Sequence, residues 1–250
     1  MLRELGSLVT AKQELAVGRI AGPQKKVLAA RDFFNHLLQV FGEVRAAYSN
    51  EVESLRKNRT GHAAILFSTD EILAGPIVTA TFRTFLDFLA LHSVDPIVIG
   101  KIGRERFAQS LPGVDFQFFQ LPTDEDPDAQ VPLIQHLLQY RQLTFVYGRY
   151  QNLINQEAAQ VTVGDSKQAV EEDVQQYYFF EPSLDAIVSF FDQNLIALLL
   201  TQTAAENNLA RLGSQITAME RADINVGLRI KRLVQEERQN TRQLRNKKQR

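Results

Sequence analysis

The last part of the chain carries one hydrophobic stripe with a repeat of three or four residues. Between residues 198 and 233 the stripe is polar only at Gln202 and Asp223. Its apolar positions are Leu198, Ala205, Leu209, Leu212, Ile216, Met219, Val226, Ile230 and Leu233. A repeat of about 3.5 residues is typical of the seam of a coiled coil. Because no proline follows Pro182 and Ser183 has the side chain of a helix N-cap, the pattern predicts one helix over residues 183–250.

A second stripe with the same repeat lies in the first part of the chain, residues 1–58. Apart from Glu51 it is apolar, and it passes through Val27, Ala30, Phe34, Leu37, Phe41, Val44, Tyr48 and Leu55. Upstream of this stripe, Gly22-Pro23 predicts a kink or break near residues 22–23, since proline lacks a backbone donor and clashes with the preceding turn.

The two stripes predict that the ends of the chain pair with each other. A helix over residues 183–250 would be roughly 100 Å long and would need a partner for its apolar face. The first helix is the partner available in the same chain. We therefore expect an antiparallel coiled coil whose seam contains Phe34, Leu37, Phe41, Val44, Leu209, Leu212, Ile216, Met219, Val226 and Ile230.

The middle of the chain, residues 60–180, alternates between strand-like and helix-like segments. Strands are predicted at residues 62–67, 95–100, 114–121 and 143–147 and from residue 161, and helices at residues 74–91 and 131–140. Such alternation favours a mostly parallel sheet covered by helices. The predicted fold class is therefore α/β, with a Rossmann-like domain inserted between two long terminal helices.

Composition and charge exclude several functions. The formal net charge is −1 and the chain has no cysteine. A general nucleic-acid binder would be basic, and disulfides, thiol nucleophiles and cysteine-ligated metals are excluded. Lys and Arg nevertheless dominate residues 228–250. The most apolar run, residues 195–200, is far shorter than the about 20 residues of a membrane span, so we expect a soluble protein without direct membrane insertion.

The sequence predicts no catalytic, cofactor-binding or metal site. Lys101 follows Gly100 but is not followed by the Ser or Thr of a phosphate-binding loop. Asp70 and Glu71 come directly after a predicted strand, where catalytic carboxylates often lie, yet no Ser–His or Cys–His pair accompanies them. No histidine lies three or four residues from another, as a helical metal pair requires; the histidines are His36, His62, His92 and His136.

Several segments resemble motifs of the gamma subunit of F-type ATP synthases, in the order of that family. They are residues 69–75 (TDEILAG), 96–104 (PIVIGKIGR), 143–147 followed by 155–160, and 177–182 (YYFFEP) followed by 218–225 (AMERADIN). The chain departs from the family at Glu71 and Ile72, at Gln215-Ile216, in the first helix and in its polar end, residues 246–250. It is therefore identified as a divergent member.

The resemblance implies a non-catalytic central rotor shaft without a cofactor. The implied partners are the alpha and beta subunits, the epsilon subunit and the ring of c subunits, with the protein peripheral on the cytoplasmic face of the membrane. The resemblance also places candidate subunit contacts at Asp70, Glu71, Gln215, Asn225, Arg229 and Arg232. It does not decide between H⁺ and Na⁺, or between ATP synthesis and hydrolysis.

Other interpretations of the pattern remain open at this stage. One is a stand-alone α/β enzyme or ligand-binding domain that its terminal helices dimerise, and another is a coiled-coil scaffold. The polar seam residues Gln202 and Asp223 either set the register of the coiled coil or lie where the partner helix has ended. The basic tail is either a solvated helix end or lies inside a ring with acidic walls.

Overall fold

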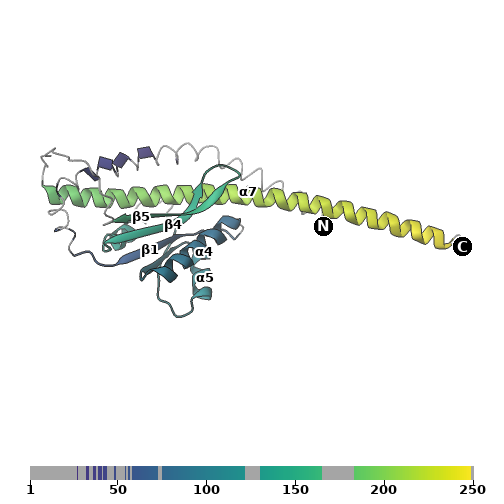
Figure 1. Cartoon of the computed structure of the whole chain (residues 1–250), viewed down its shortest axis with the longest axis horizontal. Helices are drawn as coiled ribbons and strands as arrows, with labels where there is room; N and C mark the ends of the chain where they lie inside the picture. The colour runs from purple at the N-terminus through teal and green to yellow at the C-terminus, as the bar shows by residue number, and fades with distance from the viewer. Residues whose placement is uncertain are drawn as a thin grey trace.

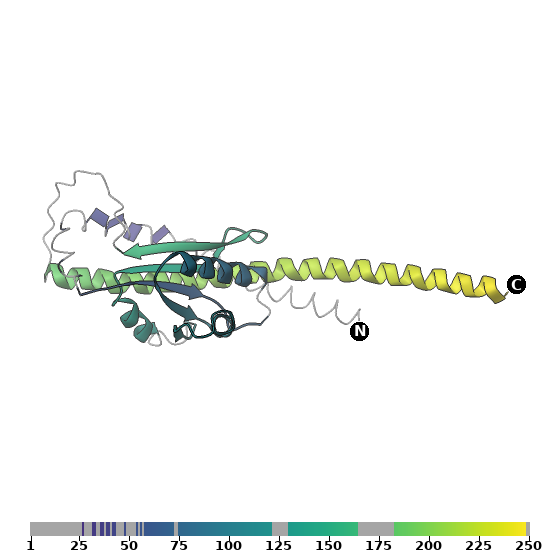
Figure 2. The same ribbon diagram turned by 60° about the horizontal axis from the view of Figure 1, so that its bottom comes forward.

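The long C-terminal helix dominates the molecule. The computed structural model describes residues 58–72, 75–121, 130–164 and 183–248, together with single residues between 27 and 56. Helix α7 (Leu184–Lys248) runs without interruption for 65 residues, and an α/β domain lies along its N-terminal half (Figures 1 and 2). The backbone N–H of Ala186 donates to Ser183 Oγ at 3.2 Å, which confirms Ser183 as the N-cap.

The domain is built on a five-stranded sheet in the order β3-β2-β1-β4-β5. Strands β1 (His62–Phe67), β2 (Asp95–Ile99), β3 (Gln117–Phe119) and β4 (Gln142–Tyr150) form parallel pairs, as the sequence predicts. The exception is β5 (Gln156–Gly164), which pairs antiparallel with β4 and starts earlier than the predicted residue 161.

A tight hairpin explains the reversed direction of β5. The side chain of Asn152 accepts hydrogen bonds from the backbone N–H groups of Ile154 and Asn155 at 3.0 and 2.8 Å. Asparagine commonly forms this kind of local turn, and a short turn can only join antiparallel strands. This turn was not predicted from the sequence, and strand β4 was therefore predicted too short, at residues 143–147.

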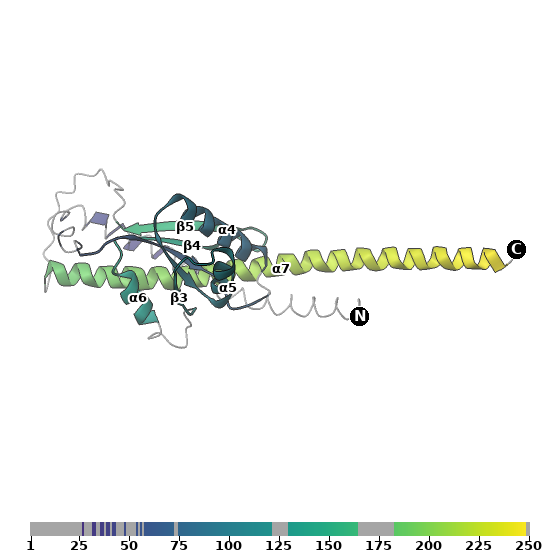
Figure 3. The ribbon, with the colours of Figure 1, turned by 90° about the horizontal axis from the view of Figure 1, so that it is seen from below.

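Helices cover both faces of the sheet, as a parallel sheet requires. One face packs on α4 (Pro76–Leu91) and α5 (Lys101–Ser110), through residues such as Phe85 and Phe107. The other face packs on α6 (Val131–Leu137) and on residues 195–200 of α7. Figure 3 shows these elements gathered around the N-terminal half of α7. Helix α4 begins two residues later than the predicted range 74–91, because proline favours the first position of a helix and Pro76 occupies it. Helix α6 ends at Leu137, three residues before the end of the predicted range 131–140.

Burial divides α7 into two halves. Residues 195–216 are mostly buried, including Leu209, Leu212 and Ile216 of the predicted seam. Beyond residue 219 the helix projects past the domain (Figure 1), and its described side chains are exposed or half-buried. The two polar residues of the seam fall on different sides of this division, because Gln202 is buried and Asp223 is exposed.

The first stripe is described only at single positions. Val27 is 2% exposed and belongs to a cluster with Ile77, Leu209 and Leu212, and the half-buried Leu37 packs against the cluster that includes residues 195–200 of α7. The predicted seam residues Phe34, Phe41 and Val44 lie outside the described residues, as do the predicted break at residues 22–23 and the segment 177–182.

Candidate functional site where the sheet meets the long helix

Strands β1 and β4 end against α7, and Asn207 of that helix joins them. Its Nδ2 donates to the backbone oxygen of Ser68 at 3.0 Å, and its Oδ1 accepts from the backbone N–H of Gly148 at 2.9 Å. All three groups are buried, so each hydrogen bond satisfies a backbone group that would otherwise be costly to bury. One side chain of α7 therefore fixes two neighbouring strands.

Ser214 of α7 caps another element of the domain, helix α4. The N-cap residue of α4 is Gly75, which has no side chain, and Ser214 Oγ accepts the hydrogen bond from the backbone N–H of Ile77 at 3.1 Å. The two backbones are close enough that a Cβ on Gly75 would lie 2.6 Å from Ser214 Oγ and 2.7 Å from its backbone carbon. Gly75 also has a φ of 75°, which other residues rarely adopt. This contact requires glycine at residue 75.

The two carboxylates that follow β1 both contact cations of the same chain. Arg211 of α7 donates to Glu71 Oε2 at 2.7 Å and to Asn208 Oδ1 at 2.8 Å. Asp70 Oδ1 accepts from the backbone N–H of Lys101 at 2.7 Å, at the start of α5, and Asp70 Oδ2 lies 3.9 Å from Nζ of the same lysine. The two candidate subunit contacts, Asp70 and Glu71, lie next to each other on the β1–α4 loop, where both are exposed.

We refer to Asn207, Arg211 and Ser214, with the groups that they contact, as the collar.

The other predicted contact residues lie along α7, at or beyond the collar. Gln215 is half-buried, and Asn225, Arg229 and Arg232 are exposed on the projecting half of the helix. On the predicted seam, Met219, Val226 and Ile230 are half-buried there. These residues do not meet in one site, since they follow one another along the helix.

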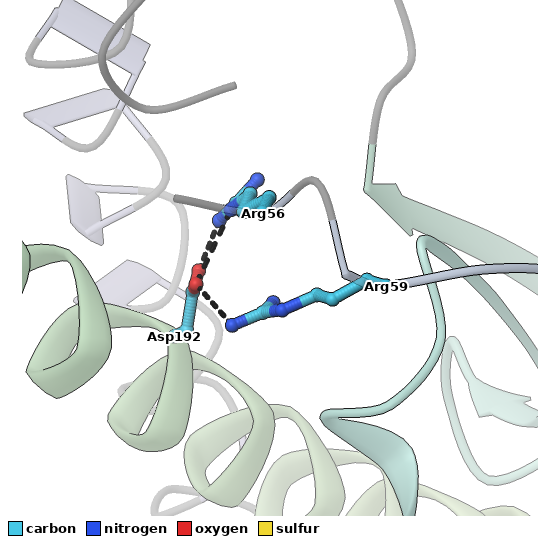
Figure 4. A network of polar contacts seen from close by, with 3 residues as sticks. All are labelled: Arg56, Arg59 and Asp192. Carbon is cyan, nitrogen blue, oxygen red and sulfur yellow. Dashed lines mark hydrogen bonds and ion pairs between the residues drawn. The ribbon is translucent and has the colours of Figure 1, made fainter. Parts of the chain in front are cut away.

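A second group of polar contacts attaches α7 to the rest of the chain, near the start of the helix (Figure 4). The carboxylate of Asp192 accepts hydrogen bonds from two arginines of the segment before β1. Arg56 contacts both carboxylate oxygens, and Arg59 contacts Oδ2 at 2.7 Å. The side chain of Asp192 is 3% exposed. We refer to these three residues as the foot clamp.

The foot clamp was not predicted, although the sequence carries a signal for it. Asp192 is an isolated carboxylate in a strongly apolar part of the helix, between Val188 and Leu195. A lone acidic residue on a buried face needs a cation, and Arg56 and Arg59 stand at the end of the first stripe. The collar residues gave a weaker signal, because polar residues are common on long helices.

His62 has a perturbed pKa at the opposite edge of the sheet from the collar. Burial lowers the pKa of His62, and the neighbouring His92 lowers it further. Its Nε2 lies 2.8 Å from Thr144 Oγ1, which in turn lies 2.8 Å from Thr162 Oγ1. These contacts connect β1, β4 and β5 through side chains.

Within the described ranges, no three His, Asp or Glu side chains come together in a way that would bind a metal ion. In the same part of the chain, no helix combines the length and the apolar character of a membrane span.

The structure thus combines an α/β domain with one uninterrupted helix, which forms a layer of that domain and then projects from it. The family described as ATP synthase matches residues 2–245 of the chain. Similar curated proteins are the ATP synthase gamma chains of Ruthia magnifica subsp. Calyptogena magnifica and Desulfitobacterium hafniense. They are 23% and 20% identical to this chain, and both matches cover 93% of it and 86% of the relative.

Solved structures show the same fold. The chain is similar to one from the central stalk and c-ring of the Tetrahymena thermophila mitochondrial ATP synthase, with a TM-score of 0.68 and 15% identity, covering 86% of this chain and 99% of that one. It is also similar to a chain of the Euglena gracilis mitochondrial ATP synthase rotor, with a TM-score of 0.56 and 13% identity, covering 94% and 98%.

The chain therefore belongs to the ATP synthase family, as a gamma chain. This confirms the family that the sequence resembles, and the similar solved chains come from a central stalk and from a rotor. These comparisons do not favour the stand-alone enzyme, the ligand-binding domain or the scaffold.

Proposed function

We propose that this chain transmits rotation from a membrane ring of c subunits to the catalytic alpha and beta subunits. The observation that supports this most directly is the continuity of α7. The same helix is a layer of the α/β domain and the projecting stalk, so the domain cannot turn without turning the stalk. The collar and the foot clamp attach the helix to the rest of the chain at two levels.

The stalk is an antiparallel coiled coil of the two chain ends in this proposal. Val27 clusters with Leu209 and Leu212, whereas Arg56 contacts Asp192. Of the described residues in the first segment of the chain (residues 1–58), the one with the higher number therefore contacts the earlier part of α7. This is the order that antiparallel pairing produces. The proposed domains are residues 1–58 and 183–250 for the coiled coil and 60–180 for the inserted domain.

The inserted domain is Rossmann-like in this proposal. Its strand order, β3-β2-β1-β4-β5, begins like that of doubly wound folds, and β1 to β4 are parallel with helices on both faces. The antiparallel β5 is the departure from that pattern. In this setting the sheet supports the shaft, and the collar lies at the carboxyl end of β1.

The charge and exposure of α7 support the assignment of partners. The projecting half carries exposed Asn225, Arg229 and Arg232, and we assign it to the cavity of the alpha and beta subunits. The α/β domain, at the other end, is assigned to the c-ring and the epsilon subunit, and Asp70, Glu71 and Gln215 to contacts near the collar. This arrangement is peripheral to the membrane, on its cytoplasmic face.

An asymmetric shaft would couple rotation to catalysis by contacting each beta subunit differently. A contact that stabilises one beta conformation more than another shifts the population of the two by that difference in free energy. The coupling is reciprocal for binding, so nucleotide binding also favours one shaft position. The shaft needs stiffness for this role and no reactive group of its own.

Assembly with catalytic subunits tests the proposal. The chain is co-expressed with the other subunits of its ATP synthase, the complex is placed in lipid vesicles, and ATP-driven ion pumping is measured with a dye. We expect co-purification with the alpha and beta subunits and pumping that depends on this chain. A chain that purifies alone as a stable monomer or dimer, with no binding to those subunits, would contradict the proposal.

A further inference from the structure

The foot clamp brings two arginines to one buried carboxylate. The side chains of Asp192, Arg56 and Arg59 are 3%, 10% and 23% exposed. Arg56 binds both oxygens of the carboxylate, a geometry that fixes the relative orientation of the two side chains. The clamp therefore specifies position and orientation, which apolar packing alone does not.

Stability is a weak explanation for burying these charges. Removing three charged groups from water is costly, and well-packed apolar side chains of similar size are often as stabilising as a buried ion triad. Buried ionic groups are instead well suited to setting register. The contacts of this clamp join the end of the first segment to the second or third turn of α7, across more than 130 residues of sequence.

The clamp and the collar attach α7 at two separate levels. Asp192 and Asn207 are 15 residues apart, which is about 22 Å along the helix at 1.5 Å per residue. The collar fixes α7 to strands β1 and β4 and to helix α4. The foot clamp fixes it to the segment that leads into β1, because Arg59 stands three residues before His62. Two attachments at different positions along α7 restrict both its translation along its axis and its rotation about that axis, relative to the rest of the chain. A single attachment restricts these motions less.

We infer that Asp192, together with Arg56 and Arg59, is a positioning site that holds the first segment in register against α7 while the shaft carries torque. This inference rests on the proposed function and adds a specific residue set to it. When the clamp is lost, the first segment slips against α7 under load, and part of the rotation is not transmitted. The expected defect lies in coupling, while ATP hydrolysis by the catalytic subunits continues.

A reversible cross-link tests the inference within one protein, because the chain has no cysteine of its own. The variant Arg56→Cys, Asp192→Cys is assembled into the whole complex, in which the accessible cysteines of the other subunits have been replaced. Ions pumped per ATP hydrolysed are measured before and after adding a bis-methanethiosulfonate, which links the two cysteines through disulfides, and again after reduction of these disulfides. The single variant Asp192→Cys, treated in the same way, is the control.

We expect the ratio of pumping to hydrolysis to fall roughly twofold or more without the cross-link. It should recover when the cross-link forms and fall again on reduction, while the control stays low throughout. Normal coupling before cross-linking would overturn the inference, and so would a formed cross-link that restores nothing. If the complex with the unmodified chain does not pump at all, the proposed function itself has failed.

A second variant separates register from stability if the cysteine variant does not assemble. Replacing all three residues with leucine (Arg56→Leu, Arg59→Leu, Asp192→Leu) removes the buried charges and leaves an apolar contact. We expect this complex to assemble and hydrolyse ATP but to pump fewer ions per ATP. A complex with unchanged coupling would show that the clamp contributes only stability, and the inference would be wrong.

Discussion

The two halves of α7 have the same secondary structure but are stabilised in different ways. In the half that lies along the domain, polar side chains are buried and bonded to the backbone of other elements, as Asn207 and Ser214 show. In the projecting half the polar side chains are exposed, and many are charged. The first half is held by its own chain, whereas the second half has a surface suited to contacts with other subunits. Substitutions in the first half should therefore affect folding as well as coupling, whereas those in the second half should affect coupling or assembly and leave the domain folded.

A proline in the embedded half should have the largest effect. Leu212 is buried, and Leu212→Pro removes a helix hydrogen bond, clashes with the preceding turn and leaves a cavity. We expect a loss of more than about 3 kcal/mol of unfolding free energy and no coupled ATP synthesis. Urea denaturation and synthesis in vesicles measure the two effects.

Met219→Pro is the matched variant beyond the collar. The described side chains near Met219 are half-buried or exposed, so the domain should remain folded while the stalk breaks. We expect normal domain stability with coupling lost. Unchanged coupled synthesis in either proline variant would contradict a continuous rigid shaft.

Removing the carboxylate of the foot clamp should have the next largest effect on folding. Asp192→Ala removes the carboxylate that Arg56 and Arg59 both contact, and the two arginines remain partly buried. Breaking a buried ion pair from one side costs about 3–5 kcal/mol. Chemical denaturation of the purified chain measures this loss, and a cost below that of an ordinary surface substitution would mean that the clamp is not buried in solution.

The collar should be sensitive to a single added methyl group. Gly75→Ala combines a positive φ with a contact of 2.6 Å to Ser214, so we expect a destabilisation of about 1–3 kcal/mol. Gly113→Ala is the control, since its φ is 91° but nothing lies within 4 Å of the added carbon. The difference between the two variants measures the close contact alone. Equal losses would show that α4 and α7 are further apart than described.

Charge reversal on the projecting half should leave folding nearly unchanged. Arg229 and Arg232 are exposed, and Arg232→Glu should alter the unfolding free energy by no more than about 0.5 kcal/mol. Its effect should be on assembly with the alpha and beta subunits, measured by co-purification and by the salt dependence of binding. Strong unfolding of the isolated chain would show that this residue is packed within the chain.

The smallest effect should come from the pH dependence that His62 contributes. Burial keeps the pKa of folded His62 below 6.5, its ordinary value, so the unfolded chain binds a proton first as the pH falls. Stability should therefore decrease as the pH drops below about 6.5, and the decrease should be smaller in His62→Gln. Denaturation at several pH values measures the slope, and an identical slope in both proteins would rule out His62 as its source.

Periodicity predicted most of the elements, but it did not predict helix α5 or the contacts between the elements. The stripe through Leu209, Leu212 and Ile216 predicted α7 almost to its ends, because helix spacing is a local property of the sequence. Strand β1 was predicted at residues 62–67, where the structure has it, since a buried parallel strand is a short apolar run. The start of β5 was missed because it depends on one turn formed by Asn152.

The candidate site was predictable only in part. Asp70 and Glu71 were selected because they follow a strand, and they do lie at the edge of the sheet. Their contacts with Lys101 and Arg211 depend on three-dimensional packing across 31 and 140 residues of sequence, which no local pattern encodes. The same reason explains why Asp192 was missed, although its isolation among apolar residues was visible.

Rotation of the α/β domain shows directly whether the domain and the stalk turn as one body. In the variant Glu105→Cys, a bead is attached to the new cysteine on the exposed surface of α5. The complex is fixed to a glass surface through its catalytic subunits. When ATP is added, we predict that the bead turns continuously in one direction and stops when hydrolysis stops. ATP hydrolysis with a bead that does not rotate would show that the domain and the stalk do not turn together.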